Sequence, residues 1–114
     1  MRFQSHQLIL GFILAALKAQ LEANLAFQYE RLNAARQTSE SIRSEILPGS
    51  QSAFDAATKG FQAGKFNFLD VLDAQRTWFQ AKSQYIQSLI DAHQAVAEIE
   101  RILGDGVIHH QAQE

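Results

Sequence analysis

The sequence predicts an all-α protein, a long antiparallel helical hairpin of the coiled-coil type. The chain has 114 residues, 46% of them hydrophobic, and its single proline and six glycines are typical of ordered structure with few turns. Apolar residues recur at heptad spacing on both sides of a glycine-containing turn near residues 62–70. We therefore expect one hairpin over residues 21–104, preceded by a separate segment, 1–20, and followed by a flexible tail, 105–114.

Residues 1–20 are apolar, and the sequence alone leaves their role open. Arg2 precedes the apolar run 8–17, which is about half of the ~20 residues that a membrane-spanning helix needs. The run has the length of the apolar part of a signal peptide. The favoured interpretation is the start of an ordinary buried helix, and a start produced by truncation is a third option.

The first helix of the hairpin is predicted to carry two neighbouring seams, each an apolar line at heptad spacing. Pro48 lacks an amide hydrogen and its ring clashes with the preceding turn, so we expect a kink or break there that leaves two pieces. The two lines are Leu25, Leu32, Ala35, Ser39, Ile42, Ile46, Gly49, Ala53, Ala56 and Gly60, and beside them Tyr29, Leu47, Ser50, Phe54, Ala57, Phe61 and Gly64.

The second helix is predicted over residues 70–103, where neither proline nor glycine interrupts about 50 Å of helix. Its first seam consists of Val71, Ala74, Trp78, Ala81, Tyr85, Ser88, Ala92, Ala95, Ile99 and Ile102. Its second seam consists of Leu72, Gln75, Phe79, Lys82, Ile86, Leu89, His93, Val96, Glu100 and Leu103. We expect the small residues Ala74, Ala81, Ala92 and Ala95 to face Ala53, Ala56 and Gly60.

Two seams on one helix predict two neighbours. A helical barrel supplies a neighbour on each side, and a four-helix bundle made by dimerisation of one hairpin would bury the same residues. We expect the isolated chain to self-associate as a dimer or higher oligomer in either case.

The predicted tip has the residues of a helix end followed by a helix start. Gly64 followed by Lys65 fits a left-handed helix cap with a cation near the negative end of the dipole. Asn67 fits an N-cap, and Asp70 fits the third position of the helix that follows. Arg76 has the spacing to pair with Asp73 in the same helix, or it reaches a neighbouring hairpin.

Residues 53–104 resemble the C-terminal helical segment of TolC-like outer membrane factors, and above all the branch that serves heavy-metal efflux pumps. The resemblance rests on GKFNFLDVLDAQRT at 64–77 and AEIERILG at 97–104. It implies a trimeric duct whose hairpin tip forms part of a closed periplasmic aperture. Asp70, Asp73 and Arg76 are then the aperture and gating candidates.

The resemblance also implies that the turn at Ala63, Gly64 and Lys65 meets the periplasmic adaptor, which works with an inner membrane pump. The function that the resemblance implies is that of a component, a C-terminal fragment, of the trimeric efflux duct, which is a passive export channel of the periplasm and outer membrane with metal cations as the first substrate. The alternative is a dimerising helical module that conducts nothing.

Other classes of function find little support in the composition. Ten basic and twelve acidic residues give a net charge of −2, so we expect no nucleic-acid partner, and the absence of cysteine excludes thiolate chemistry. No catalytic constellation or cofactor motif is present, so we expect no enzymatic activity and no cofactor. The four histidines lack metal-ligand spacing, and we expect no metal site.

Overall fold

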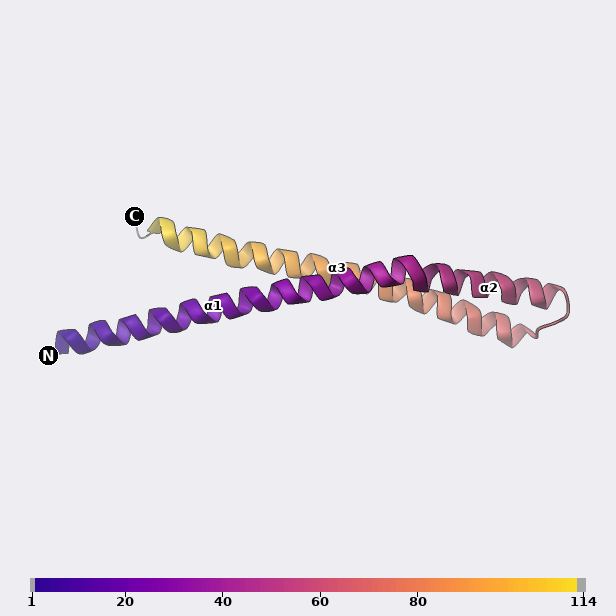
Figure 1. The fold of residues 1–114 in the computed structure, drawn as a ribbon, viewed down its shortest axis with the longest axis horizontal. Helices are drawn as coiled ribbons and strands as arrows, with labels where there is room; N and C mark the ends of the chain where they lie inside the picture. The colour runs from indigo at the N-terminus through magenta and orange to yellow at the C-terminus, as the bar shows by residue number, and fades with distance from the viewer. Residues whose placement is uncertain (1, 113–114) are drawn as a thin grey trace.

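The chain forms a rod of 90 × 24 × 15 Å in the computed structural model, which describes the backbone of residues 2–112 and the side chains as far as residue 105. Figure 1 shows the first helix running to a tip at one end and α3 returning antiparallel, with both termini at the opposite end. The elements are α1 (Arg2–Ser41), the π-helix η1 (Ile42–Ile46), α2 (Leu47–Gln62) and α3 (Phe68–Ala112). Residues 2–112 contain no strand, so the expected all-α hairpin is confirmed.

The first seam of α3 is the side that packs against the rest of the hairpin. All ten of its residues are buried or half-buried, and Ala95 is completely inaccessible. Leu32, Ala95 and Ile99 form the centre of the core, with Leu25 packed beside them. The heptad pattern of the sequence therefore identified the packed side of α3 because no residue interrupts its period.

On the first helix, the packed side changes at η1. In α1 the buried positions, Gln28, Leu32 and Ala35, lead in heptad steps to Ile42. In α2 the buried positions are Ser50 and Ala57. Leu47 is the next packed residue after Ile42, five residues on, where a heptad allows a step of three or four. The π-helix supplies the extra residue, since the Leu47 amide donates to the Ile42 carbonyl, an i to i−5 bond.

This change corrects the predicted pairing of small residues. Ala53 and Ala56 were expected to face the alanines of α3, but both are exposed, and Ser50 and Ala57 are buried in their stead. Each of the two predicted lines faces α3 over only part of its length, because the extra residue in η1 rotates α2 relative to α1.

Pro48 bends the helix without dividing it. It is the second residue of α2, two residues after the end of η1, and the helical backbone continues from α1 through η1 into α2. Figure 1 shows the change of direction at this junction. The expected break into two separate pieces is therefore wrong, since the π-turn accommodates the proline within a continuous helix.

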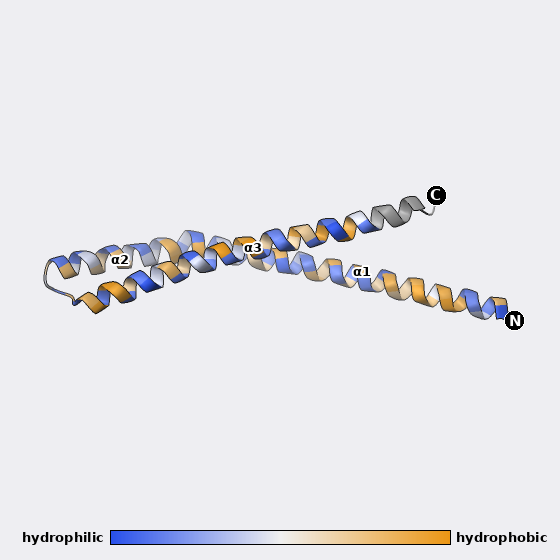
Figure 2. Cartoon of the chain, turned by 180° about the vertical axis from the view of Figure 1, so that it is seen from behind, coloured by the Kyte–Doolittle hydropathy of each residue, from blue (hydrophilic) through white to orange (hydrophobic). Residues whose placement is uncertain are grey.

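The N-terminal part of α1 packs against nothing in the chain. Figure 2 shows hydrophobic residues there on a helix that diverges from α3, and residues 2–23 are all exposed. The interpretation as an ordinary buried helix is therefore wrong. A stretch of 18 residues with mean hydropathy 1.5 is long and apolar enough to cross a membrane by length and composition alone, a test that a signal sequence also passes.

The backbone of α3 continues in helical form to Ala112, whereas the sequence predicts a flexible tail from residue 105. Gly104 and Gly106 each disfavour a helix by about 1 kcal/mol relative to alanine. No proline follows them, and each residue added to an existing helix gains a backbone hydrogen bond.

Candidate functional site: the hairpin tip

The tip is a five-residue connection, 63–67, that begins with a Schellman motif. The Lys65 amide donates to the Gly60 carbonyl (2.7 Å) and the Gly64 amide donates to the Phe61 carbonyl (3.0 Å). Gly64 has a φ of +74°, which is the left-handed conformation that the motif requires. Ala63, Gly64 and Lys65 are exposed, so the backbone of the turn is accessible to another molecule.

A second glycine makes room for an aromatic ring behind the turn. A Cβ atom placed on Gly60 would overlap the ring of Phe66. Phe61 and Phe68 pack across the two helices, with ring centroids 5.6 Å apart. The contact between Gly60 and Phe66 was not anticipated, although a glycine within a helix, six residues before an aromatic residue and just ahead of a turn, is a usable indication of close packing.

Asp70 caps the start of α3. Its amide donates to Asn67 Oδ1 (3.1 Å), and the Asn67 amide donates to Asp70 Oδ2 (3.2 Å), which together form a reciprocal capping box. The carboxylate also lies at the positive end of the helix dipole. Asp70 is exposed, so the capping role leaves it accessible at the end of the rod.

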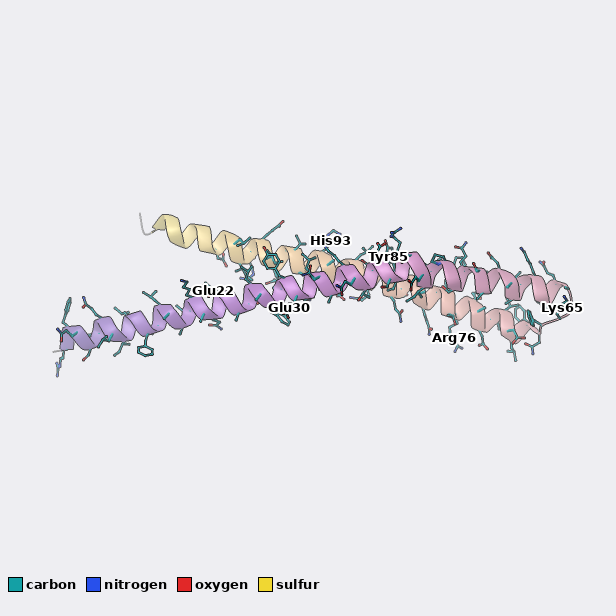
Figure 3. All side chains as sticks on the ribbon, in the orientation of Figure 1. Glu22, Glu30, Lys65, Arg76, Tyr85 and His93 are labelled. Carbon is teal, nitrogen blue, oxygen red and sulfur yellow. The ribbon has the colours of Figure 1, made fainter. Side chains whose placement is uncertain are left out.

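Asp73 and Arg76 are not paired with each other in this chain. Both are exposed, and none of the ion pairs within the described side chains includes either residue. Thr77 Oγ1 donates to the backbone carbonyl of Asp73 (3.0 Å), so this hydrogen bond does not involve the Asp73 carboxylate. Figure 3 shows Arg76 on the side of α3 that faces away from α2, with Lys65 at the tip itself.

The second seam of α3 carries large apolar side chains that are exposed. Phe79 is 52% exposed and Ile86 57% exposed, and Leu72 and Leu89 are exposed as well. A shallow open groove beside the seam is lined only by residues of α3, namely Leu72, Gln75, Arg76, Phe79, Gln80, Ser83 and Gln84. No other element of the described chain covers this side.

Of the predicted packing residues, Trp78, Tyr85, Val96 and Ile99 lie against the rest of the hairpin. Trp78 stacks on Phe54 with ring centroids 5.4 Å apart, and Lys82 Nζ lies 3.6 Å from the centroid of the Trp78 ring. Phe79, Ile86 and Leu89 belong to the outward seam and are exposed. The ring of Phe79 lies beside its neighbours on α3, with its centroid 5.9 Å from that of Trp78 and 5.7 Å from Lys82 Nζ.

The described side chains offer no group of three or more acidic, histidine or cysteine residues that could hold a metal ion. His6 and His93 are both exposed, and the side chains of His109 and His110 lie outside the described residues. The chemistry at the tip is therefore that of exposed carboxylates, one lysine and an accessible turn.

The fold and its exposed seam define a long helical hairpin with one apolar side that its own helices leave uncovered. Residues 14–105 match the family described as outer membrane efflux protein, and the chain belongs to this family. It is 47% identical over 89 residues to the cobalt-zinc-cadmium resistance protein CzcC of Cupriavidus metallidurans.

That match covers 78% of this chain and 21% of CzcC, so the chain spans about a fifth of the length of this curated relative. The family resemblance is thereby confirmed, together with its heavy-metal branch. No solved structure matches the chain.

Proposed function

We propose that this chain contributes a helical hairpin to the wall of an outer membrane efflux duct that exports metal cations. Membership of the outer membrane efflux family supports a place in such a duct. The similarity to a cobalt-zinc-cadmium resistance protein supports metal cations as the substrate class. The hairpin would lie in the periplasm as one part of a trimeric assembly.

The observation that carries the proposal is the second seam of α3. Phe79 and Ile86 are more than half exposed although they follow the same heptad spacing as the buried seam beside them. In a barrel of helices every helix has a neighbour on both sides, so both seams are covered. An isolated hairpin with a single packed side would not need the second seam.

The exposed carboxylates at the tip support a cation-selective aperture. Asp70 is held in place by Asn67 and Asp73 is unengaged, and both are accessible to solvent. A three-fold axis would place three copies of each carboxylate around one opening, and such a ring attracts cations and disfavours anions. Arg76 would then reach a neighbouring hairpin, since none of the ion pairs among the described side chains includes it.

The exposed turn at Ala63, Gly64 and Lys65 is the proposed contact with a periplasmic adaptor, which in turn works with an inner membrane pump. At Gly64 the lack of a side chain lets another backbone approach closely. Lys65 would add a positive charge beside that approach.

The test is a chimera in which the 89 residues of this chain that match CzcC replace the corresponding segment of CzcC. We expect cells that carry the chimera to keep their resistance to zinc, cobalt and cadmium. Loss of resistance, with the chimera present in the outer membrane at normal amounts, would contradict the proposed role.

Charge reversal in the same chimera tests the aperture. We expect Asp73→Lys to shift the ion selectivity of the purified duct in planar bilayers from cations towards anions. Asp55→Lys is the matched control, because Asp55 is an exposed carboxylate of α2 about two helical turns from the tip. Equal selectivity in the two variants would remove the gating assignment from Asp73.

A further inference from the structure

The helix that leads to the tip carries two alternative packing faces, and only one is in use. The packed face of α2 consists of Leu47, Ser50, Phe54 and Ala57. The heptad series of α1, continued without interruption past Ile42, leads to a second face made of Ile46, Gly49, Ala53 and Ala56. This second face is apolar throughout, at the spacing needed to pack on α3, and it is exposed.

The extra residue in η1 selects between these faces. The Leu47 amide donates to the Ile42 carbonyl, an i to i−5 bond that adds one residue to this turn. Each later packed position therefore lies one residue further along the sequence, and the Leu47 face meets α3. If the same residues formed an ordinary α-helix, Ile46 would occupy the place that Leu47 holds, and the Ile46 face would meet α3.

Pro48 explains why the π-turn lies at this point. In a regular α-helix the proline ring would clash with the carbonyl of Ser44, and that carbonyl would lose its amide donor. The wider turn at Ile42–Ile46 ends two residues before the proline. The hydroxyl of Ser50 donates to the carbonyls of Ile46 (2.6 Å) and Leu47 (3.2 Å), which anchors the start of α2 after the turn.

We propose that η1 and Pro48 form a register switch, by which α2 turns about its own axis and exchanges one packing face for the other. In the present register Phe54 stacks on Trp78. In the second register Phe54 and Ala57 turn outward, the small residues Gly49, Ala53 and Ala56 face α3, and α2 advances by about 1.5 Å towards the tip. Each register would place one heptad face of α2 on α3, which gives the element two alternative packed arrangements.

The switch acts on the tip because α2 leads directly into it. Gly60 lies in the last turn of α2, where it accepts the Lys65 amide and contacts the ring of Phe66. A one-residue turn of α2 moves Gly60 away from Phe66 and changes how the turn at 63–67 is presented. This inference concerns the hairpin by itself and does not depend on the proposed efflux function.

Thiol accessibility tests the switch directly, since the chain has no native cysteine. Single variants Ala56→Cys and Ala57→Cys are labelled with a maleimide in the native background and in a Pro48→Ala background, at one protein concentration. In the native background we expect residue 57 to react about tenfold more slowly than residue 56, because only residue 57 is buried. With Pro48→Ala we expect the protection to move to residue 56.

A rescue variant separates the switch from a loss of stability. Deletion of Glu45 in the Pro48→Ala background removes the extra residue, so an uninterrupted α-helix again places the Leu47 face on α3. We expect protection to return to residue 57. Trp78, the only tryptophan, gives an independent measurement: its fluorescence in Pro48→Ala should match that of Phe54→Ala, and the deletion should restore it.

The reciprocal change is decisive, because partial unfolding would expose both positions and could not protect residue 56. Faster labelling at both positions with Pro48→Ala, or unchanged labelling at both, would overturn the proposal. Protection at residue 56 that persists after deletion of Glu45 would overturn it as well.

Discussion

Gly64 is the residue whose positive φ lets the chain reverse direction at the tip. Its φ of +74° lies in the left-handed region, which costs a residue with a side chain roughly 1–2 kcal/mol. Gly49 is a matched control, because it lies inside α2 with nothing within 4 Å of an added Cβ.

We therefore predict opposite effects for the same substitution at these two glycines. Gly64→Ala should lower the free energy of unfolding by about 1 kcal/mol. Gly49→Ala should raise it by roughly 0.5–1 kcal/mol, because alanine favours the helix. Urea unfolding followed by circular dichroism measures both, and equal effects at the two positions would contradict the assignment of the turn.

Glu40 and Arg43 form a two-bonded ion pair that spans the start of η1. Arg43 Nη2 donates to Glu40 Oε1 (2.7 Å) and Nε donates to Oε2 (3.1 Å). These hydrogen bonds, together with the charge of Arg43, lower the pKa of Glu40 below its ordinary value of 4.5. A lowered carboxyl pKa stabilises the fold above the unfolded pKa, and the effect is lost as the pH falls through the folded value.

The pair therefore acts near neutral pH and is lost on acidification below about 4.5. We predict that Arg43→Gln returns the pKa of Glu40 towards its ordinary value, as measured by NMR titration of the side-chain carboxyl. Arg43→Lys keeps the charge without the fork of two donors and should give an intermediate result. An unchanged Glu40 titration in Arg43→Gln would show that the pair does not form in solution.

At the scale of the element, α3 has one side that stabilises the hairpin and one that does not. Ile99 is 7% exposed in the core, whereas Ile86 is 57% exposed on the second seam. We predict that Ile99→Ala lowers the free energy of unfolding by roughly 2–4 kcal/mol, since a buried isoleucine loses its contacts and leaves a cavity.

Ile86→Ala is the control for that substitution and should change the stability of the monomer by less than about 0.5 kcal/mol. Both values come from urea unfolding at concentrations where the chain is monomeric. A loss at position 86 as large as that at position 99 would mean that the two sides of α3 have been assigned in reverse.

The elements differ in how far the sequence alone specifies them. The first seam of α3 follows from its heptad spacing because nothing interrupts the period. The tip follows from turn chemistry. Glycine at position 64 favours a left-handed turn residue, and Asn67 and Asp70 favour the start of a helix. The π-turn could not be derived, because α2 offers two largely apolar faces at heptad spacing and only packing against α3 selects one.

Pro48 predicts an irregularity in the first helix, but the sequence does not say whether it is a kink, a break or a π-turn. A kink, a break and a π-turn all relieve the clash of the proline ring, and their energies differ through contacts made elsewhere in the hairpin. The candidate site has a similar limit. Sequence predicts Asp70 as a capping residue through local chemistry, whereas any role of Asp73 depends on other chains.

At the scale of the whole molecule, the rod has more apolar surface than its own two helices cover. The second seam of α3 exposes Leu72, Phe79, Ile86 and Leu89, and the N-terminal part of α1 is apolar and exposed. Large contiguous apolar surfaces of this kind mark sites where a protein binds other proteins or membranes. We therefore expect helices of neighbouring chains to cover the second seam.

Sedimentation equilibrium of the purified chain across a range of concentrations tests this claim most directly. The native chain should sediment as a dimer or higher oligomer, and the double variant Phe79→Glu and Ile86→Glu should be largely monomeric with its helical content unchanged. A native chain that remains a stable monomer at the highest concentration would contradict the account.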